Sequence, residues 1–245
     1  MTDQDLARRA VALLDLTDLS NGLDETGVER LCARAVTPLG PVVAVCLWAG
    51  FVPQARRLLR DTPVRVATVV NFPDGGDDVM RAADEARYAI LDGADEIDVV
   101  LPWRALAAGR REVVGALLGA VRAVVPPGRT LKTILETGEL KTPALIREAA
   151  RIAIGTGADF IKTSTGKTGV SATPEAVSLM LEEIRACGRA VGIKPSGGIR
   201  TLEDARSYLA LADGVMGPDW ANPATFRFGA SGLLDVLLAA GRAAP

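Results

Sequence analysis

Two lysines occupy matching positions in two similar motifs, FIKTS and GIKPS, which contain Lys162 and Lys194. Each lysine follows apolar residues, as it would at the end of a buried strand. Two ammonium groups that converge in a poorly solvated site repel each other, so one of them loses its proton more easily. A neutral amine can attack a carbonyl carbon and form an iminium ion, which labilises a neighbouring C–C or C–H bond. The pair therefore predicts amine catalysis on a carbonyl substrate, with ion pairs to Asp15 or Asp98 as the structural alternative.

The residue types that are scarce or missing narrow the chemistry further. The chain contains no histidine, the commonest general base and zinc ligand. Its cysteines, Cys32, Cys46 and Cys187, lie far apart, so we expect neither a structural zinc site nor a disulfide framework. Magnesium held by carboxylates remains an open alternative. Only five of the 28 basic residues are lysines, and arginine cannot replace them as amine nucleophiles because it stays protonated.

An iminium mechanism also needs a group that moves protons. Without histidine, a carboxylate or an ammonium group must do this, directly or through water. Asp98 lies in EIDVV, where it alternates with apolar neighbours, so we expect it to face the interior with Glu96 and Val100. Asp95 and Glu96 come earlier in that segment and are predicted to support the structure. Asp98 is therefore the candidate for proton transfer.

These residues lie in a chain that alternates β-rich runs with amphipathic stretches. We expect strands at 13–17, 42–48, 65–70, 96–101, 130–136, 160–165, 190–196 and 213–217, and helices at 28–35, 52–60, 77–93, 111–125, 144–157, 173–188, 201–212 and 231–243. The strands are nearly continuous apolar runs, as parallel strands buried on both faces should be. The pattern predicts an α/β fold, a (β/α)8 TIM barrel, with residues 1–245 as one domain. An open doubly wound sheet is the alternative, but no G-x-G-x-x-G motif follows the first strands.

The composition is that of an ordinary globular protein. The net charge is −2, and no basic block indicates binding to nucleic acid or to a membrane surface. The N-terminal segment is polar and lacks the apolar core of a signal peptide, and the longest apolar stretch is too short to span a bilayer. We therefore expect a cytoplasmic protein.

In a barrel of this kind, polar residues at the C-terminal ends of the strands form the active site. The polar residues that the predicted strands place there are Asp15, Thr17, Cys46, Asn71, Asp98, Glu136, Lys162 and Lys194. Any one of them can be a satisfied polar residue or a helix cap. As a set they indicate a site, because burying so many ionisable groups is costly unless they pair.

Glycine-rich turns near these strand ends suggest where an anion binds. Gly197 and Gly198 directly follow the strand that contains Lys194, and RFGASGLLD provides a second glycine- and serine-containing turn before a helix. Such turns let backbone N–H groups approach a phosphate closely. Together with the loop at Gly166 and Lys167, they predict a phosphorylated substrate.

The motifs LDLTDL, ATVVNFPDG, GADEIDVV, ILETGEL, GADFIKTSTGK, GIKPSGGIRT and FRFGAS closely resemble those of the deoxyribose-phosphate aldolases, in order from about residue 13 to 231. The resemblance implies a cofactor-free class I aldolase. Such an enzyme reversibly cleaves 2-deoxy-D-ribose 5-phosphate to D-glyceraldehyde 3-phosphate and acetaldehyde in deoxynucleoside breakdown. Homodimers are common among the members of this family.

The resemblance also implies residue roles. Lys162 matches the Schiff-base lysine, Lys194 the second active-site lysine that perturbs it, and Asp98 the aspartate of the proton relay. Asp15 and Thr17 match a supporting pair near the substrate, and Cys46 matches a cysteine beside the pocket that the mechanism does not require. The residues that match the phosphate site are Gly166, Lys167, Gly197, Gly198 and Ser231.

The sequence departs from the family pattern at three places. It ends in GRAAP, where several relatives have a tail that closes with a tyrosine; Gly232 replaces a second serine; and the turn Trp48-Ala49-Gly50 lacks an expected proline. These differences concern a proton-transfer step, one phosphate contact and the aldehyde pocket. Two other functions remain open: another iminium-forming barrel acting on a phosphorylated sugar, and a metabolite-binding barrel without catalysis.

Overall fold

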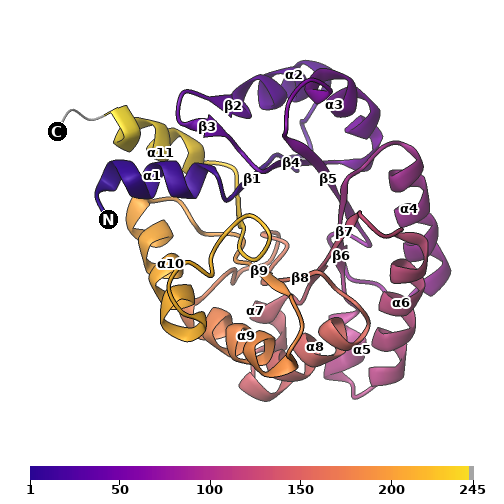
Figure 1. The fold of residues 1–245 in the computed structure, drawn as a ribbon. Helices are drawn as coiled ribbons and strands as arrows, with labels where there is room; N and C mark the ends of the chain where they lie inside the picture. The colour runs from indigo at the N-terminus through magenta and orange to yellow at the C-terminus, as the bar shows by residue number, and fades with distance from the viewer. Residues whose placement is uncertain (243–245) are drawn as a thin grey trace.

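The computed structural model describes residues 1–242, and its centre is a barrel of eight parallel strands (Figure 1). The strands are β1 (Leu14–Thr17), β4 (Ala44–Leu47), β5 (Arg65–Val70), β6 (Glu96–Val100), β7 (Thr130–Ile134), β8 (Phe160–Lys162), β9 (Gly192–Lys194) and β10 (Phe228–Ala230). Hydrogen bonds join them in the order β10-β1-β4-β5-β6-β7-β8-β9. Parallel bridges from Ile193 to Phe226 and from Ser196 to Gly229 link the two ends of this order. The predicted (β/α)8 architecture is thereby confirmed.

Helices surround the barrel (Figure 1). They are α1 (Asp3–Val11), α2 (Glu25–Arg34), α3 (Val52–Leu59), α4 (Val79–Leu91), α5 (Trp103–Ala107), α6 (Arg111–Val124), α7 (Thr137–Leu140), α8 (Pro143–Gly155), α9 (Pro174–Cys187), α10 (Leu202–Met216) and α11 (Leu233–Arg242). A short 3₁₀ helix, η1 (Ala49–Phe51), and a small hairpin of β2 (Val36–Thr37) and β3 (Gly40–Pro41) complete the described elements. All eight predicted helices are present, although position 243 of the last one lies outside the described residues. The additional N-terminal helix α1 packs beside α11 (Figure 1).

The helix boundaries follow the expected capping chemistry. The side chains of Asp78 and Thr173 accept hydrogen bonds from the first turns of α4 and α9, and Pro174 fills the first position of α9, where a missing N–H costs nothing. Gly188 ends α9 with φ of 67°, a left-handed conformation that glycine adopts without a steric penalty. Local sequence therefore determines where these helices begin and end.

One predicted strand is wrong. Residues 213–217 are the last turn of α10 and its C-cap, and the eighth strand is β10, within the segment expected to form only a turn. Helix α10 buries Ala205, Tyr208, Leu209 and Ala212, spaced by three and four residues, so the apolar run at its end continues a helical face. A short apolar run does not by itself distinguish a strand from the end of a buried helix.

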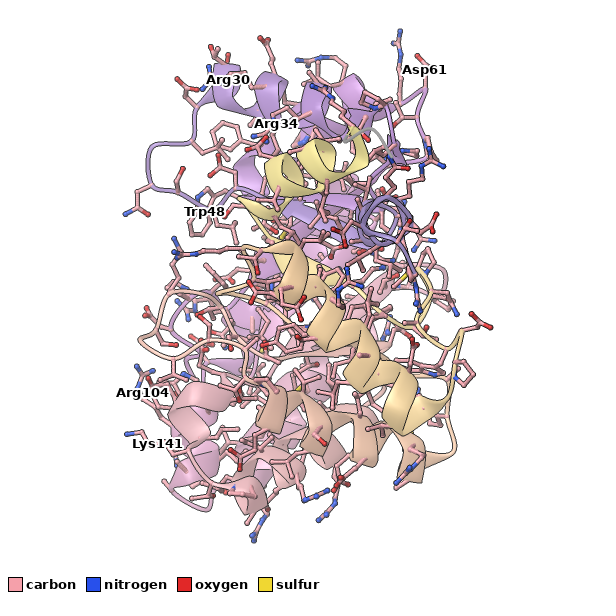
Figure 2. All side chains as sticks on the ribbon, turned by 90° about the vertical axis from the view of Figure 1, so that its left-hand side faces the viewer. Arg30, Arg34, Trp48, Asp61, Arg104 and Lys141 are labelled. Atoms are coloured by element: carbon pink, nitrogen blue, oxygen red, sulfur yellow. The ribbon has the colours of Figure 1, made fainter. Side chains whose placement is uncertain are left out.

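The strands separate an apolar layer from a charged barrel interior. On β6, Ile97 and Val99 belong to the apolar core, whereas Glu96 and Asp98 alternate with them and are completely buried. Residues that follow the strands share one side of the molecule: Figure 2 shows Trp48, Arg104 and Lys141 along one edge and Asp61, which precedes β5, on the other. The C-terminal ends of the strands thus face one way. Within residues 1–242, no helix has the length and apolar character needed to cross a membrane.

Candidate active site

The pairing register brings the two motif lysines together. Lys162 at the end of β8 is paired with Lys194 at the end of β9, and Asp98 on β6 is paired with Lys132 on β7. Inward-facing side chains at the same level of a barrel form one layer. The prediction that Lys162 and Lys194 occupy equivalent places on consecutive strands is confirmed.

Asp98 lies between the two lysines. Its Oδ2 atom accepts hydrogen bonds from Lys162 Nζ at 2.8 Å and from Lys194 Nζ at 2.7 Å. Lys194 Nζ is also 2.6 Å from Asp15 Oδ2. Lys194 therefore has two carboxylate partners, and Lys162 shares the only one that it contacts among the described residues.

Three further residues, Glu96, Lys132 and Arg227, join this site and are not among the site residues that the sequence predicts. Lys132 Nζ contacts Asp98 Oδ1 at 2.8 Å and Glu96 Oε2 at 2.5 Å. Arg227 Nη1 contacts Asp15 Oδ1 at 2.8 Å, and its Nη2 contacts Glu96 Oε1 at 3.2 Å. We call the seven residues Asp15, Glu96, Asp98, Lys132, Lys162, Lys194 and Arg227 the ion cluster.

The charges of the ion cluster determine its protonation. Its three carboxylates face four basic groups, so the cluster is neutral when one basic group has lost its proton. All seven side chains are almost completely buried, and an uncompensated charge in such a place is costly. Lys162 is the candidate for the neutral group, because it contacts one carboxylate and the other three basic groups contact at least two each.

The pKa shifts agree with this assignment. Burial lowers the pKa of Lys162, although Asp98 opposes the effect. Burial would also lower the pKa of Lys194, but Asp15 and Asp98 outweigh it and raise that pKa above its usual value. Burial would raise the pKa of Asp98, but three lysines hold it well below its ordinary range. The cluster therefore favours a neutral amine at Lys162 beside a firmly held ammonium group and carboxylate.

A cavity of about 1240 Å³ opens above the ion cluster at the C-terminal ends of the strands. Its lining includes the predicted site residues Thr17, Lys162, Gly166, Lys167, Gly197, Gly198 and Ser231. Asp15, Cys46, Asp98 and Lys194 are fully buried below it. Of the ion cluster, Lys162 is the member that reaches the cavity wall, so it is the amine that a bound molecule can meet.

The predicted anion site forms one wall of this cavity. Gly166, Gly197 and Gly198 all have positive φ. A side chain at Gly197 would begin only 2.5 Å from the Ser171 hydroxyl, so glycine lets the two loops approach. Lys167 extends over the cavity, and its Nζ donates to the backbone oxygen of Leu19 at 2.8 Å.

Glu136 explains how the Lys167 loop is held. It follows β7 in a left-handed conformation, with φ of 56°. Its buried carboxylate accepts hydrogen bonds from the hydroxyl of Thr165 at 2.6 Å and from that of Thr168 at 3.2 Å. Burial raises the pKa of Glu136 despite these bonds. Glu136 thus acts on the loop rather than in the ion cluster.

Asn71, another of the predicted strand-end residues, has a structural role. Its side-chain amide donates to the backbone oxygens of Gly76 and Val100 at 2.8 and 2.9 Å. The amide thereby fixes the turn between β5 and α4.

The opposite side of the barrel interior is apolar. Leu19, Ala44, Cys46, Ala67 and Val69 form a small apolar cluster, against which Trp48 and Phe72 pack. Burial raises the pKa of Cys46, so its thiol stays protonated. The turn after Cys46 places the Trp48 ring edge-on to Phe72 at 5.6 Å, and its Nε1 donates to Ser20 O at 3.0 Å.

Within the described residues, no group of three or more histidine, cysteine, aspartate or glutamate side chains is arranged to hold a metal ion. The three carboxylates of the ion cluster are close together, but each is paired with lysine or arginine.

Comparison with known proteins places this arrangement in a family. The model of the DeoC/LacD family of aldolases matches residues 3–237. A deoxyribose-phosphate aldolase from Agrobacterium fabrum is 51% identical over 236 residues, which are 96% of this chain and 91% of the relative. The apo-form crystal structure of a candidate deoxyribose-phosphate aldolase from Toxoplasma gondii ME49 superposes with a TM-score of 0.90 at 30% identity, over 98% of this chain and 96% of the other. The tetrameric deoxyribose phosphate aldolase from Aeropyrum pernix gives a TM-score of 0.74 at 26% identity, over 96% and 91% of the two chains. The chain belongs to the DeoC/LacD family of aldolases.

Proposed function

We propose that this aldolase cleaves 2-deoxy-D-ribose 5-phosphate through a Schiff base on Lys162. The observation that carries the proposal is that Lys162 alone of the ion cluster both lines the large cavity and contacts a single carboxylate. A neutral amine in that position can attack an aldehyde carbon that enters from the cavity. The name of the Agrobacterium relative supplies the substrate.

The first half of the reaction forms the iminium ion. Lys162 Nζ attacks C1 of the open-chain sugar, and the carbinolamine loses its hydroxyl group as water. Lys194 donates a hydrogen bond to the departing oxygen, because two of its three N–H bonds point to carboxylates and the third is left, and we assign the proton to water relayed by Lys194, whose raised pKa makes it a weak acid on its own. Asp98 Oδ2, 2.8 Å from Lys162 Nζ, then stabilises the positive charge that the iminium ion acquires.

The second half breaks the C2–C3 bond. A base removes the proton of the C3 hydroxyl, C3 becomes the carbonyl of glyceraldehyde 3-phosphate, and the bonding electrons form an enamine at C1 and C2. Protonation of C2 and hydrolysis release acetaldehyde and restore Lys162. We assign these proton transfers to water molecules relayed by Asp98 and Lys194, because the low pKa of Asp98 makes it a weak base on its own.

We assign the substrate phosphate to the wall of the active-site cavity that the loops form. Lys167 and the turns at Gly166, Gly197-Gly198 and Ser231 surround the part of the cavity that is lined by loops. A phosphate would take the Lys167 ammonium group from the Leu19 carbonyl, which is a weaker partner because it carries no charge. We assign Asp15 and Thr17 on β1 to the support of the bound substrate. Cys46 on β4 is assigned to the border of the pocket that receives the aldehyde group of the substrate.

The setting of the reaction is also part of the proposal. We assign residues 1–245 to one aldolase domain that acts in the cytoplasm, in deoxynucleoside breakdown, without a cofactor. We also propose a homodimer, and the tetramer of the Aeropyrum relative shows that a member of this group assembles.

Reductive trapping tests the covalent step. The protein is incubated with acetaldehyde and borohydride, digested, and mapped by mass spectrometry. We expect a single ethyl adduct on Lys162. An adduct on Lys194 alone, or none, would overturn the assignment.

Two variants make the trapping result specific. Lys162→Arg removes the nucleophile, because a guanidinium group stays protonated, so it should give no adduct while its circular dichroism spectrum is unchanged. Lys141→Arg makes the same change on the edge of the molecule (Figure 2) and should label like the wild type. Release of acetaldehyde from a panel of phosphorylated sugars then separates this aldolase from another iminium-forming enzyme.

A further inference from the structure

A buried arginine closes the ion cluster on the side away from the active-site cavity. Arg227 lies directly before β10 and is only 2% exposed. Its guanidinium group contacts Asp15 Oδ1 and Glu96 Oε1, at 2.8 and 3.2 Å, and its Nε donates to the oxygen of Pro223. Arg227 also lines a separate cavity of about 710 Å³, among loops that precede the strands. Arg227 does not line the active-site cavity and reaches the site only through Asp15 and Glu96.

Glu96 is the partner that connects Arg227 to the rest of the cluster. Its Oε1 contacts Arg227, and its Oε2 is 2.5 Å from Lys132 Nζ. Lys132 in turn contacts Asp98, the carboxylate that Lys162 shares with Lys194. The contacts thus form a continuous sequence of alternating charges from the N-terminal end of the barrel to the reactive amine.

We propose that Arg227 and Glu96 are a positioning pair that sets the charge of the ion cluster so that Lys162 is its one neutral amine. The proposal rests on the proposed function of Lys162. Neither residue touches substrate; both act through Asp15 and Lys132.

The numbers of carboxylates and basic groups predict that removing Arg227 and removing Glu96 change the protonation of Lys162 in opposite directions. Without the Arg227 cation, three carboxylates face three lysines, and neutrality requires Lys162 to keep its proton. Without the Glu96 anion, two carboxylates face four basic groups, and Lys162 loses its proton more readily. A purely structural role would weaken the enzyme in both cases without such opposite shifts.

Several charged or titratable groups face Lys162 or the pair from the surrounding strands. They are Asp15 on β1, Cys46 on β4, Arg65 on β5, Asp98 on β6, Lys132 on β7, Glu136 after β7 and Lys194 on β9. Arg65 contacts Glu96 at 3.2 Å, but its side chain is 51% exposed, so solvent screens its charge. None of these groups is altered in the variants below.

The test measures the pH at which Lys162 becomes reactive. Arg227→Met, Glu96→Gln and the double variant are compared with the wild type, using the pH dependence of kcat/KM and of acetaldehyde trapping with cyanoborohydride. Arg227→Met should move the acid limb of both profiles up by about one pH unit, and Glu96→Gln should move it down by a similar amount. The double variant again has one basic group more than it has carboxylates. Its acid limb should therefore lie within a few tenths of a pH unit of the wild-type position.

Two controls separate charge from folding. Arg129→Met removes an arginine that lines the same 710 Å³ cavity and pairs with Asp95, outside the ion cluster, and should leave the limb unmoved. In Arg227→Ala, guanidinium ion at about 50 mM can enter from that cavity and should move the limb back toward the wild-type position. If Arg227→Met does not fold, the proposal is tested by Glu96→Gln alone: its acid limb must move to lower pH, and an acid limb that does not move would overturn the proposal.

The possible failures are distinguishable. A wild-type protein that is not labelled at Lys162 contradicts the proposed function. If the wild-type protein is labelled at Lys162, the pair is tested by the acid limbs of the two variants. Acid limbs that stay fixed, or that move in the same direction in Arg227→Met and Glu96→Gln, overturn the role of the pair.

Discussion

Two lysines five residues apart in one segment, Lys162 and Lys167, have opposite surroundings. The Lys162 side chain is 4% exposed, ends a strand and shares a carboxylate with a second ammonium group. Lys167 is exposed on a loop, and its ammonium group contacts a backbone oxygen. The strand therefore favours the loss of a proton, and the loop leaves a charge available for an anion.

The two regions also differ in what fixes them. Strand pairing sets the position of Lys162, because Ile134 and Lys194 flank it in the sheet. Side-chain hydrogen bonds set the Lys167 loop, because Glu136 binds Thr165 and Thr168. The proposed chemistry thus lies on the strands of the barrel, and the proposed recognition of phosphate lies on a loop.

Replacement of Lys162 should cause the largest loss of activity and so separate the two lysines most clearly. Lys162→Arg is expected to lower kcat/KM for deoxyribose 5-phosphate by at least about 10³-fold, since a guanidinium group cannot form the iminium ion. Lys167→Arg keeps a cation on the loop and should retain most of the activity. Steady-state assays of aldehyde release measure both. Equal losses in the two variants would contradict the division of roles.

The two buried lysines should differ in stability. Lys194→Met removes the buried ammonium group that contacts both Asp15 and Asp98, so its free energy of unfolding should fall by about 3–5 kcal/mol. Lys162→Met removes the amine whose charged form is disfavoured by burial, and its stability at neutral pH should equal or exceed that of the wild type. Urea denaturation of both variants gives these values. A loss in Lys162→Met as large as that in Lys194→Met would show that Lys162 is charged in the folded protein.

The pH dependence of that difference has a definite sign. The pKa of Lys162 is lowered by folding, so the unfolded chain binds more protons between the folded pKa and the ordinary value near 10.4. The stability of the wild type relative to Lys162→Met should therefore rise as the pH is increased from 8 to 10. Denaturation series at these two pH values check it, and a constant or falling difference would contradict the assignment.

The part of this site that the sequence predicts is the part encoded by strand alternation. Asp98 alternates with apolar neighbours, and Lys162 and Lys194 each follow an apolar residue near the end of a strand, so a period of two indicates which face of its strand each side chain occupies. The same rule applies to Lys132 in TLKTI, which is not among the predicted site residues. Its contact with Asp98 follows from the pairing of β6 with β7.

The residues that the sequence did not reveal depend on structure farther away. Arg227 is not among the predicted site residues, because the sequence pattern predicts the eighth strand at 213–217 and only a turn in the segment that contains β10. Glu136 was recognised as a strand-end residue, but its partners lie almost thirty residues later, on a loop without a regular pattern. Side-chain contacts between loops have no periodic signal, so sequence reasoning cannot identify them.

The Lys167 region should affect binding more than turnover. Lys167→Met is expected to raise KM for deoxyribose 5-phosphate by about 10- to 100-fold, because a charge-assisted contact with phosphate is lost, and to change kcat little. With deoxyribose, which has no phosphate, the variant and the wild type should behave alike. If KM for both sugars rose equally, Lys167 would be shaping the cavity and not binding phosphate.

We expect the smallest effect at Gly232, which lines the same cavity as Lys167. Its backbone has no positive φ, and a Cβ atom there would meet nothing within 4 Å, so Gly232→Ser adds a hydroxyl donor without strain. Next to Ser231 on the cavity wall, that hydroxyl should lower KM for the phosphorylated sugar by about three- to tenfold, the effect of one hydrogen bond to a charged group at a solvated site. Gly232→Ala controls for the altered backbone entropy, and deoxyribose controls for the phosphate. A decrease in KM that appears with Ala, or with deoxyribose, would place the phosphate elsewhere on the wall and leave Lys167 as the test of the loop.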